Sequence, residues 1–151
     1  MNSSLEKGKK RKGMYDMDLT TLQRQHNEIG AQVKEIEMDL TAANVSTNAF
    51  DISMKISRLA GLISIHLKTE DEHLYPNLKA QQDEKVKRIA EQFSREMGGI
   101  AKAFSEYKNT YRISSNIKAN PEKFIKDTTE ILKALKKRVS NEDSVLYPLL
   151  K

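Results

Sequence analysis

Apolar residues recur every three or four positions along four stretches of the chain. These stretches run over about residues 18–43, 48–75, 84–111 and 121–147. This spacing is typical of helices that bury one face, and no segment shows the alternation of apolar and polar residues that marks a strand. The prolines fall only at the boundaries of the stretches, at Pro76, Pro121 and Pro148. The pattern therefore predicts an all-α protein, an up-down-up-down antiparallel four-helix bundle with short connections.

Polar residues interrupt the buried face of three of these helices. They are His26 in the first stretch, His66, Glu70 and His73 in the second, and Arg138 and Glu142 in the fourth. The first helix is expected to begin at Asp18 or Thr20 and to end near Ala43. With a rise of about 1.5 Å per residue, the interruptions come to roughly the same height in an antiparallel bundle. This clustering favours a functional site near one end of the bundle.

The segment His66–Pro76 is repeated, with substitutions, as Arg138–Pro148. Both copies have Glu-Asp four and five residues after their first residue, and both end in Leu-Tyr-Pro. A histidine and a carboxylate four residues apart lie on one helix face, where they can bind one metal ion. An arginine keeps its proton and offers no lone pair, so the second copy cannot bind a metal in this way. We expect a buried Arg138 to pair with Glu142 and, across the bundle, with Glu70.

Two further pairs of residues belong to the same end of the bundle as the polar interruptions. Tyr75 and Tyr147 occupy equivalent positions in the two copies. We expect them to pack at the helix ends with their hydroxyls in water, and a proton or electron relay is the alternative. Gly98 and Gly99 stand inside the third stretch, where two glycines cost about 2 kcal/mol relative to alanine. A close helix approach, a kink or space for a small ligand would each account for this pair.

Composition limits the chemistry of such a site. The chain has no cysteine, so a metal would have to be bound by histidine, aspartate or glutamate. A length of 151 residues suits one domain, which we expect over residues 15–151. The sequence shows no apolar run long enough for a transmembrane segment and no signal peptide, so we expect a cytoplasmic protein.

The net charge is concentrated at the N-terminus. Residues 1–14 carry +4 of the formal charge of +5, within a segment that also contains two glycines. Such a composition predicts a basic, flexible N-terminal arm. The residues of this arm that could contact nucleic acid or another anionic surface are Lys9, Lys10, Arg11 and Lys12.

Three motifs follow one another along the chain: Leu22-x-x-x-His26-x-x-Ile29, then His66-Leu-x-x-Glu70-Asp-x-x-Leu-Tyr-Pro, then its copy ending at Pro148. In these motifs the chain resembles the hemerythrin-like (HHE cation-binding) family, from about residue 18 to residue 150. The resemblance implies a hemerythrin-like four-helix bundle with a non-haem di-iron centre, held by histidines and two bridging carboxylates. The activities that it implies are oxygen binding, redox or nitric-oxide sensing, and iron handling or repair.

Only half of the implied ligands are present. Those that match are His26, His66, Glu70 and Glu142, with Asp143 as an alternative to Glu142. His73, one turn after Glu70, could add a third imidazole. The histidines implied in the third and fourth helices are missing, because Met97 and Arg138 stand in their places. The sequence therefore predicts a degenerate site that holds at most one metal ion, and its ligand types suit iron, manganese or zinc.

Three functions are compatible with this sequence. The first is a metal-binding sensor or carrier, with iron as cofactor and a small diatomic ligand such as oxygen or nitric oxide, or a redox change, as its signal. The second is a metal-free interaction module in which Arg138, Glu142 and Glu70 replace the metal centre, acting through the basic arm or as a homodimer. The third, an oxygen-activating enzyme, has the least support, because no separate substrate pocket or acid–base group is evident.

Overall fold

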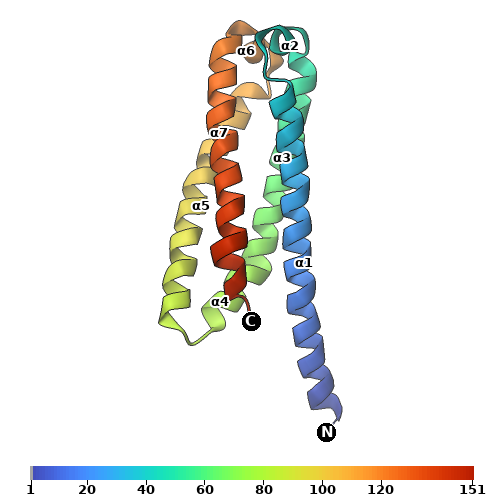
Figure 1. Ribbon diagram of the computed structural model, residues 1–151, viewed down its shortest axis with the longest axis vertical. Coiled ribbons are helices and arrows are strands. Elements are labelled where there is room, and N and C mark those ends of the chain that lie inside the picture. Colours follow the sequence, from blue (N-terminus) through green and yellow to red (C-terminus); the bar gives the residue numbers. More distant parts are fainter. Residues whose placement is uncertain (1) are drawn as a thin grey trace.

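The computed structural model describes the backbone of residues 2–151 and the side chains of residues 19–151. Four long helices make up the molecule: α1 (Asn2–Met38), α3 (Ala49–Thr69), α5 (Glu84–Tyr111) and α7 (Pro121–Asn141). They run alternately up and down (Figure 1), and contacts of α1 with α3, α3 with α5, α5 with α7 and α7 with α1 close the ring. The part of the chain that is described contains no strand. The prediction of an all-α antiparallel four-helix bundle is confirmed.

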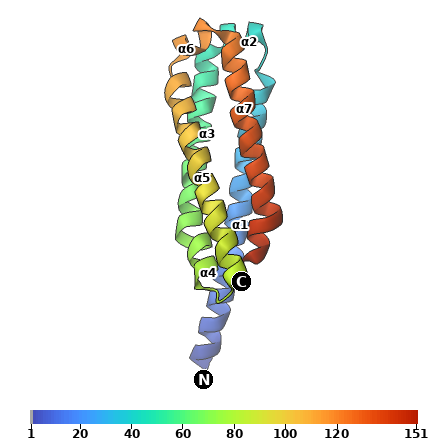
Figure 2. The ribbon, with the colours of Figure 1, turned by 90° about the vertical axis from the view of Figure 1, so that its left-hand side faces the viewer.

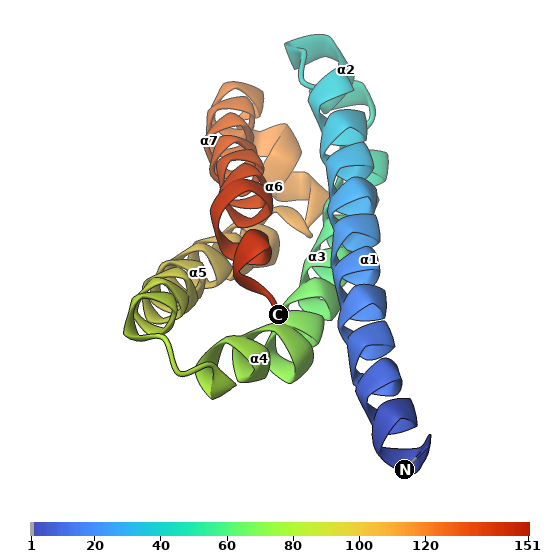
Figure 3. The same cartoon turned by 60° about the horizontal axis from the view of Figure 1, so that its bottom comes forward.

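Three short helices connect the long ones. The helices α2 (Ala42–Thr47) and α6 (Ser114–Ala119) lie at one end of the bundle, and α4 (Tyr75–Ala80) lies at the other (Figure 2). Viewed from below, α4 bridges α3 and α5 (Figure 3). Side chains cap the starts of α2, α5 and α7, since those of Thr41, Asp83 and Asn120 each accept a backbone N–H of the first turn.

The boundaries of α1 differ from the predicted ones at both ends. The helix ends at Met38, short of the predicted end near Ala43, because Thr41 has an extended backbone and starts a new helix. It begins at Asn2, before the start predicted at Asp18 or Thr20. The basic arm predicted over residues 1–14 falls where the side chains lie outside the described residues, so its role stays a prediction.

Both copies of the repeat contain a π-helical turn. One, η1 (Glu70–Leu74), follows α3, and the other, η2 (Glu142–Leu146), follows α7. In each, a backbone N–H donates to the carbonyl five residues earlier, from Tyr75 to Glu70 and from Tyr147 to Glu142. The wider turn moves the buried face on by one residue. A short 3₁₀ helix, η3 (Tyr147–Leu149), follows η2.

The shift by one residue changes which side chains face the core. Unbroken α-helical spacing would bury His73 and Val145, but Leu74 and Leu146 are buried in their place. His73 is 38% exposed and Val145 is 45% exposed. The π-helical turn therefore takes His73 off the buried face, where a third imidazole would have to lie, and leaves it partly exposed near the helix end, as is expected of a histidine that is not a ligand.

The core consists of two apolar clusters. The larger surrounds the middle of the bundle and the end near α2 and α6, and it includes Ile29, Ile63 and Leu135. The smaller lies near α4, and it includes Leu22, Leu74, Phe93, Leu146 and Tyr147. A layer of buried polar side chains lies between them along each contributing helix: His26, His66, Glu70, Arg138 and Glu142. Among the described residues, no helix is both long and apolar enough to span a membrane.

Candidate metal centre

Four buried side chains from the two copies of the repeat and from α1 meet in this polar layer. They are His26 from α1, His66 from α3, Glu70 from the start of η1 and Glu142 from the start of η2. Each offers one ligand atom, and all four atoms lie within 4.8 Å of one another. The structure thus brings together four of the five predicted ligands. It does not bring His73 to them, since that side chain lies 3.9 Å from Glu72 and is partly exposed.

The ligand atoms face one another at short range. The Nε2 atoms of His26 and His66 lie 3.1 Å apart. Glu142 Oε1 lies 2.8 Å from Nε2 of His26 and 3.3 Å from Nε2 of His66. Glu70 Oε2 lies 3.3 Å from Nε2 of His66. Two imidazole nitrogens and two carboxylate oxygens therefore point at a common centre.

Hydrogen bonds on the outer side of each ring set the tautomer. His26 Nδ1 lies 2.8 Å from Asp143 Oδ1, and a carboxylate can only accept. His66 Nδ1 lies 2.9 Å from Gln25 Oε1, and the amide nitrogen of Gln25 donates to Thr69 Oγ1. Both Nδ1 atoms are therefore donors, and each neutral imidazole presents the lone pair of Nε2 to the centre.

Tyr147 completes the inner surface of the site. Its hydroxyl lies 2.9 Å from Glu70 Oε2, 3.2 Å from Glu142 Oε1 and 3.0 Å from His26 Nε2. The expectation that this hydroxyl lies in water is wrong, because the π-helical turn places Tyr147 over Glu142. The sequence signal was the repeated Leu-Tyr-Pro, which marks both tyrosines but does not show their direction.

The inner surface of the site has more hydrogen-bond acceptor atoms than donor hydrogens. Five atoms face the centre, from His26, His66, Glu70, Glu142 and Tyr147, and the tyrosine hydroxyl supplies the one hydrogen among them when both imidazoles are neutral. Glu70 is fully buried, and its Oε1 has no hydrogen-bond partner. Lone pairs held together at these distances require a cation, which is either an added proton or a metal ion. The donor set thus fits a metal ion bound by two nitrogen and several oxygen ligands.

The other half of the layer is occupied by Arg138. It is 5% exposed, and its Nε donates to Glu142 Oε2 at 3.0 Å. Its NH2 donates to the hydroxyl of Tyr75 at 3.3 Å, and its guanidinium carbon lies 4.7 Å from the centre of the Phe93 ring. NH1 lies 3.9 Å from Glu96. The predicted pair with Glu142 is confirmed, and the hydroxyl of Tyr75, like that of Tyr147, is not directed to water.

The predicted contact between Arg138 and Glu70 is not formed. The Glu70 carboxylate accepts from Tyr147 through Oε2, and its Oε1 stays without a partner. Arg138 NH1 likewise has no hydrogen-bond partner. Glu142 therefore joins the two halves alone, with Oε1 toward the histidines and Oε2 toward the arginine.

The two glycines of α5 do not mark a close approach of helices. An added Cβ at Gly98 or Gly99 would meet no atom within 4 Å. Gly98 instead lines a cavity of about 200 Å³, together with Glu70, Tyr75 and Met97. This cavity reaches the side of Glu70, so space for a small ligand is the explanation that the structure favours.

The carboxylates control the protonation of His66 in the metal-free protein. Burial alone would lower the pKa of His66, but hydrogen bonds to Glu142 and Glu70 and their charges outweigh it and raise this pKa to about 9. Burial also raises the pKa of Glu70, against the effect of His66. For Glu142, burial is outweighed by hydrogen bonds from His26 and His66, and the pKa falls well below its usual range.

We expect the metal-free protein to lose stability as the pH rises from about 6.5, where an unfolded histidine titrates, to about 9, the pKa of His66 in the folded chain. A raised folded pKa stabilises the protonated form, so its contribution is complete below the lower value and is lost toward the higher one. Urea denaturation across this range should show a loss on the order of a few kcal/mol. The slope should persist in His73→Ala, and a midpoint that does not change with pH would contradict the assignment.

Comparison with known proteins agrees with this geometry. The family model of the hemerythrin HHE cation binding domain matches residues 17–150. No curated protein and no solved structure was found to match the chain. The match covers α3, α5 and α7, α1 from residue 17 onward, and every residue of the polar layer. The chain therefore belongs to the hemerythrin HHE cation-binding family.

Proposed function

We propose that this protein binds a single metal ion, with iron as the physiological ion, and acts as a sensor or carrier. The observation that carries the proposal is the inner surface of the polar layer, where five lone-pair atoms share one hydrogen. His26, His66, Glu70 and Glu142 would hold the ion. The charge of Arg138 beside Glu142 restricts the site to one ion, because it occupies the second half of the layer.

The residues around the ligands orient them and limit access. Asp143 and Gln25 hold the two rings with Nε2 inward, and Glu142 is fixed between His26 and Arg138. When bound, iron would supply reversible redox change and binding of a small ligand. The cavity of about 200 Å³ beside Glu70 supports a ligand of diatomic size, such as oxygen or nitric oxide.

Metal content tests the proposal directly. Protein purified from iron-supplemented cells should contain about one metal ion per chain, and His66→Ala should contain almost none, because it loses a buried nitrogen ligand. His73→Ala is the matched control, since it removes the same side chain seven residues later at a partly exposed position. Elemental analysis of all three proteins, after treatment with a weak chelator, gives the measurement. Equal metal in the wild type and His66→Ala would contradict the proposal.

The second candidate is a metal-free interaction module, favoured by the buried pair of Arg138 and Glu142. In this case the wild type and both histidine variants contain no metal. An added proton on His66, whose pKa is raised, would then replace the ion. The partner would bind elsewhere, through the basic residues of the N-terminal arm or at a homodimer face.

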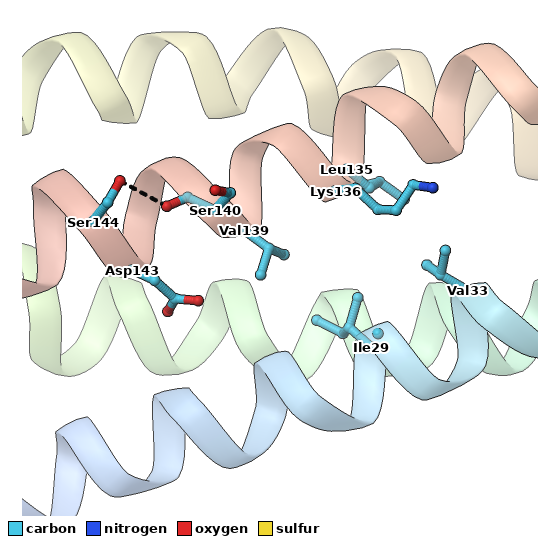
Figure 4. Close-up of a pocket in the computed structure, with 9 residues that line it drawn as sticks. Ile29, Val33, Leu135, Lys136, Val139, Ser140, Asp143 and Ser144 are labelled. Atoms are coloured by element: carbon cyan, nitrogen blue, oxygen red, sulfur yellow. Dashed lines mark hydrogen bonds between the residues drawn. The ribbon is translucent and has the colours of Figure 1, made fainter.

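Asp143 should tune the affinity for the metal. A groove of about 500 Å³ between α1 and α7 is lined by Ile29, Val33, Val139 and Asp143, and Asp143 points across it toward α1 (Figure 4). Because its carboxylate holds His26, we expect Asp143→Ala to weaken metal binding by about 10–100-fold. Competition with a coloured chelator measures the change. Ser144 lines the same groove, so Ser144→Ala is the control and should bind the metal as tightly as the wild type does. Unchanged metal affinity in Asp143→Ala would contradict the role of Asp143.

A further inference from the structure

The tyrosine of the second copy lies where a metal ligand would lie. Tyr147 is 3% exposed, and its hydroxyl is within 3.3 Å of an inner atom of His26, His66, Glu70 and Glu142 alike. A hydroxyl that serves only to hydrogen-bond one partner would not need to lie within hydrogen-bonding distance of four. Its ring also stacks on that of His26, with centroids 5.1 Å apart, which fixes its direction.

The tyrosine of the first copy has a different environment. The hydroxyl of Tyr75 receives a hydrogen bond from Arg138, in the half of the layer without histidines. Each tyrosine therefore crosses to the half built by the other copy. Tyr147 faces the lone pairs of the histidines, and Tyr75 faces a fixed cation. Tyr75 can therefore serve as the control for Tyr147, because both are buried phenols in the polar layer and only Tyr147 faces the histidines.

We propose that Tyr147 is itself a metal ligand, bound as phenolate, and that the site is built for ferric iron. This proposal rests on the proposed function and adds to it a fifth ligand and an oxidation state. Phenolate and carboxylate oxygens are hard donors, which prefer hard, highly charged cations. Two carboxylates and one phenolate carry three negative charges against the three positive charges of Fe(III). Arg138 adds one positive charge beside Glu142, and both imidazoles are neutral when they bind the ion.

Ligation exchanges protons for iron with no change of oxidation state. The ion enters as Fe(III). The hydroxyl of Tyr147 and the imidazole of His66, which holds an added proton in the metal-free protein, each give up one proton to bind iron, and both protons pass to solvent. A bound cation reverses the local preference for the neutral phenol, as it does for thiols and for water. The hydrogen bond from Tyr147 to Glu70, at 2.9 Å, provides the first acceptor. Glu70 also lines the cavity of about 200 Å³.

The test uses the visible absorption that a phenolate bound to ferric iron produces. Metal-free wild type, Tyr147→Phe and Tyr75→Phe are loaded with ferric citrate, desalted, and measured for iron per chain, for visible absorption, and for phenolate vibrations by resonance Raman spectroscopy. We expect the wild type and Tyr75→Phe to be coloured and to show phenolate vibrations. Tyr147→Phe should lose the band completely while it still contains iron held by the histidines and carboxylates.

The outcomes separate this proposal from the proposed function. Iron without a phenolate band in the wild type, or a band that persists in Tyr147→Phe, overturns the tyrosine ligand and leaves metal binding intact. A wild type that takes up no iron overturns both. If Tyr147→Phe no longer retains iron, the spectra of the wild type and Tyr75→Phe decide. Phenolate vibrations equal in both support the proposal, and their absence overturns it.

Discussion

Replacing Glu142 with alanine is expected to destabilise the metal-free protein by about 3–5 kcal/mol, because it leaves a buried arginine without its anionic partner. Arg138 is 5% exposed and donates from Nε to Glu142 Oε2 at 3.0 Å. Its other contacts are a tyrosine hydroxyl, an aromatic ring and a more distant, half-exposed Glu96. Glu96 carries a negative charge, but at 3.9 Å and with its side chain 53% exposed it is screened by water and does not replace Glu142. Urea denaturation followed by circular dichroism measures the change.

A second variant shows whether the unpaired cation causes the loss. The double variant Arg138→Leu, Glu142→Ala removes both charges, so it should be more stable than Glu142→Ala alone. The matched surface control is Glu28→Ala, which breaks an exposed pair with Arg24 four residues away and should cost at most about 1 kcal/mol. A double variant no more stable than the single one would show that Arg138 does not depend on Glu142.

Replacing Arg138 with histidine is expected to raise the metal content from about one ion per chain toward two. The substitution removes the fixed cation and adds an imidazole next to Glu142 Oε2. Glu70 Oε1, which is buried and has no partner, lies on a carboxylate whose other oxygen already faces the first site. Two carboxylates could then each serve two ions. Elemental analysis and the number of ions released to a chelator give the measurement.

Arg138→Gln is the control for this change. It also removes the charge, but an amide is a poor ligand for these ions, so its metal content should stay at about one. If neither variant binds more metal than the wild type, the arginine is not what prevents a second ion from binding. An equal rise in both variants would show that the charge of Arg138 alone, and not the missing imidazole, kept the second ion out.

The bundle and most of the site could be predicted because they depend on spacing within α-helices. The steps of three and four residues in α1, α3, α5 and α7 identify the buried faces directly. The candidate ligands His26, His66, Glu70 and Glu142 all lie at or before the point where the α-helical spacing ends. Their meeting at one height follows from the rise per residue and the antiparallel order.

What the sequence did not show lies beyond that point in both copies. The π-helical turns add a residue to the helix, so Leu74 replaces His73 on the buried face and Leu146 replaces Val145. The same turns direct Tyr75 and Tyr147 inward. Glu-Asp-x-x-Leu is compatible with either kind of turn, because the choice depends on which side chains the opposite helices offer. The sequence marks Asp143 only as an alternative to Glu142, because its contact with His26 depends on how closely α1 approaches α7.

If the protein is the sensor proposed above, the division of the core into two apolar clusters determines which part of it would respond to the ion. The larger cluster is continuous from Ile29 and Ile63 to the far loops and includes no ligand. The smaller cluster near α4 includes Tyr147 and packs against the polar layer. Departure of an ion would therefore loosen the α4 end while the remainder of the bundle keeps its fold. In the proposed sensor, binding and loss of the ion would therefore change the order of one end of the bundle while the rest of the chain stays folded.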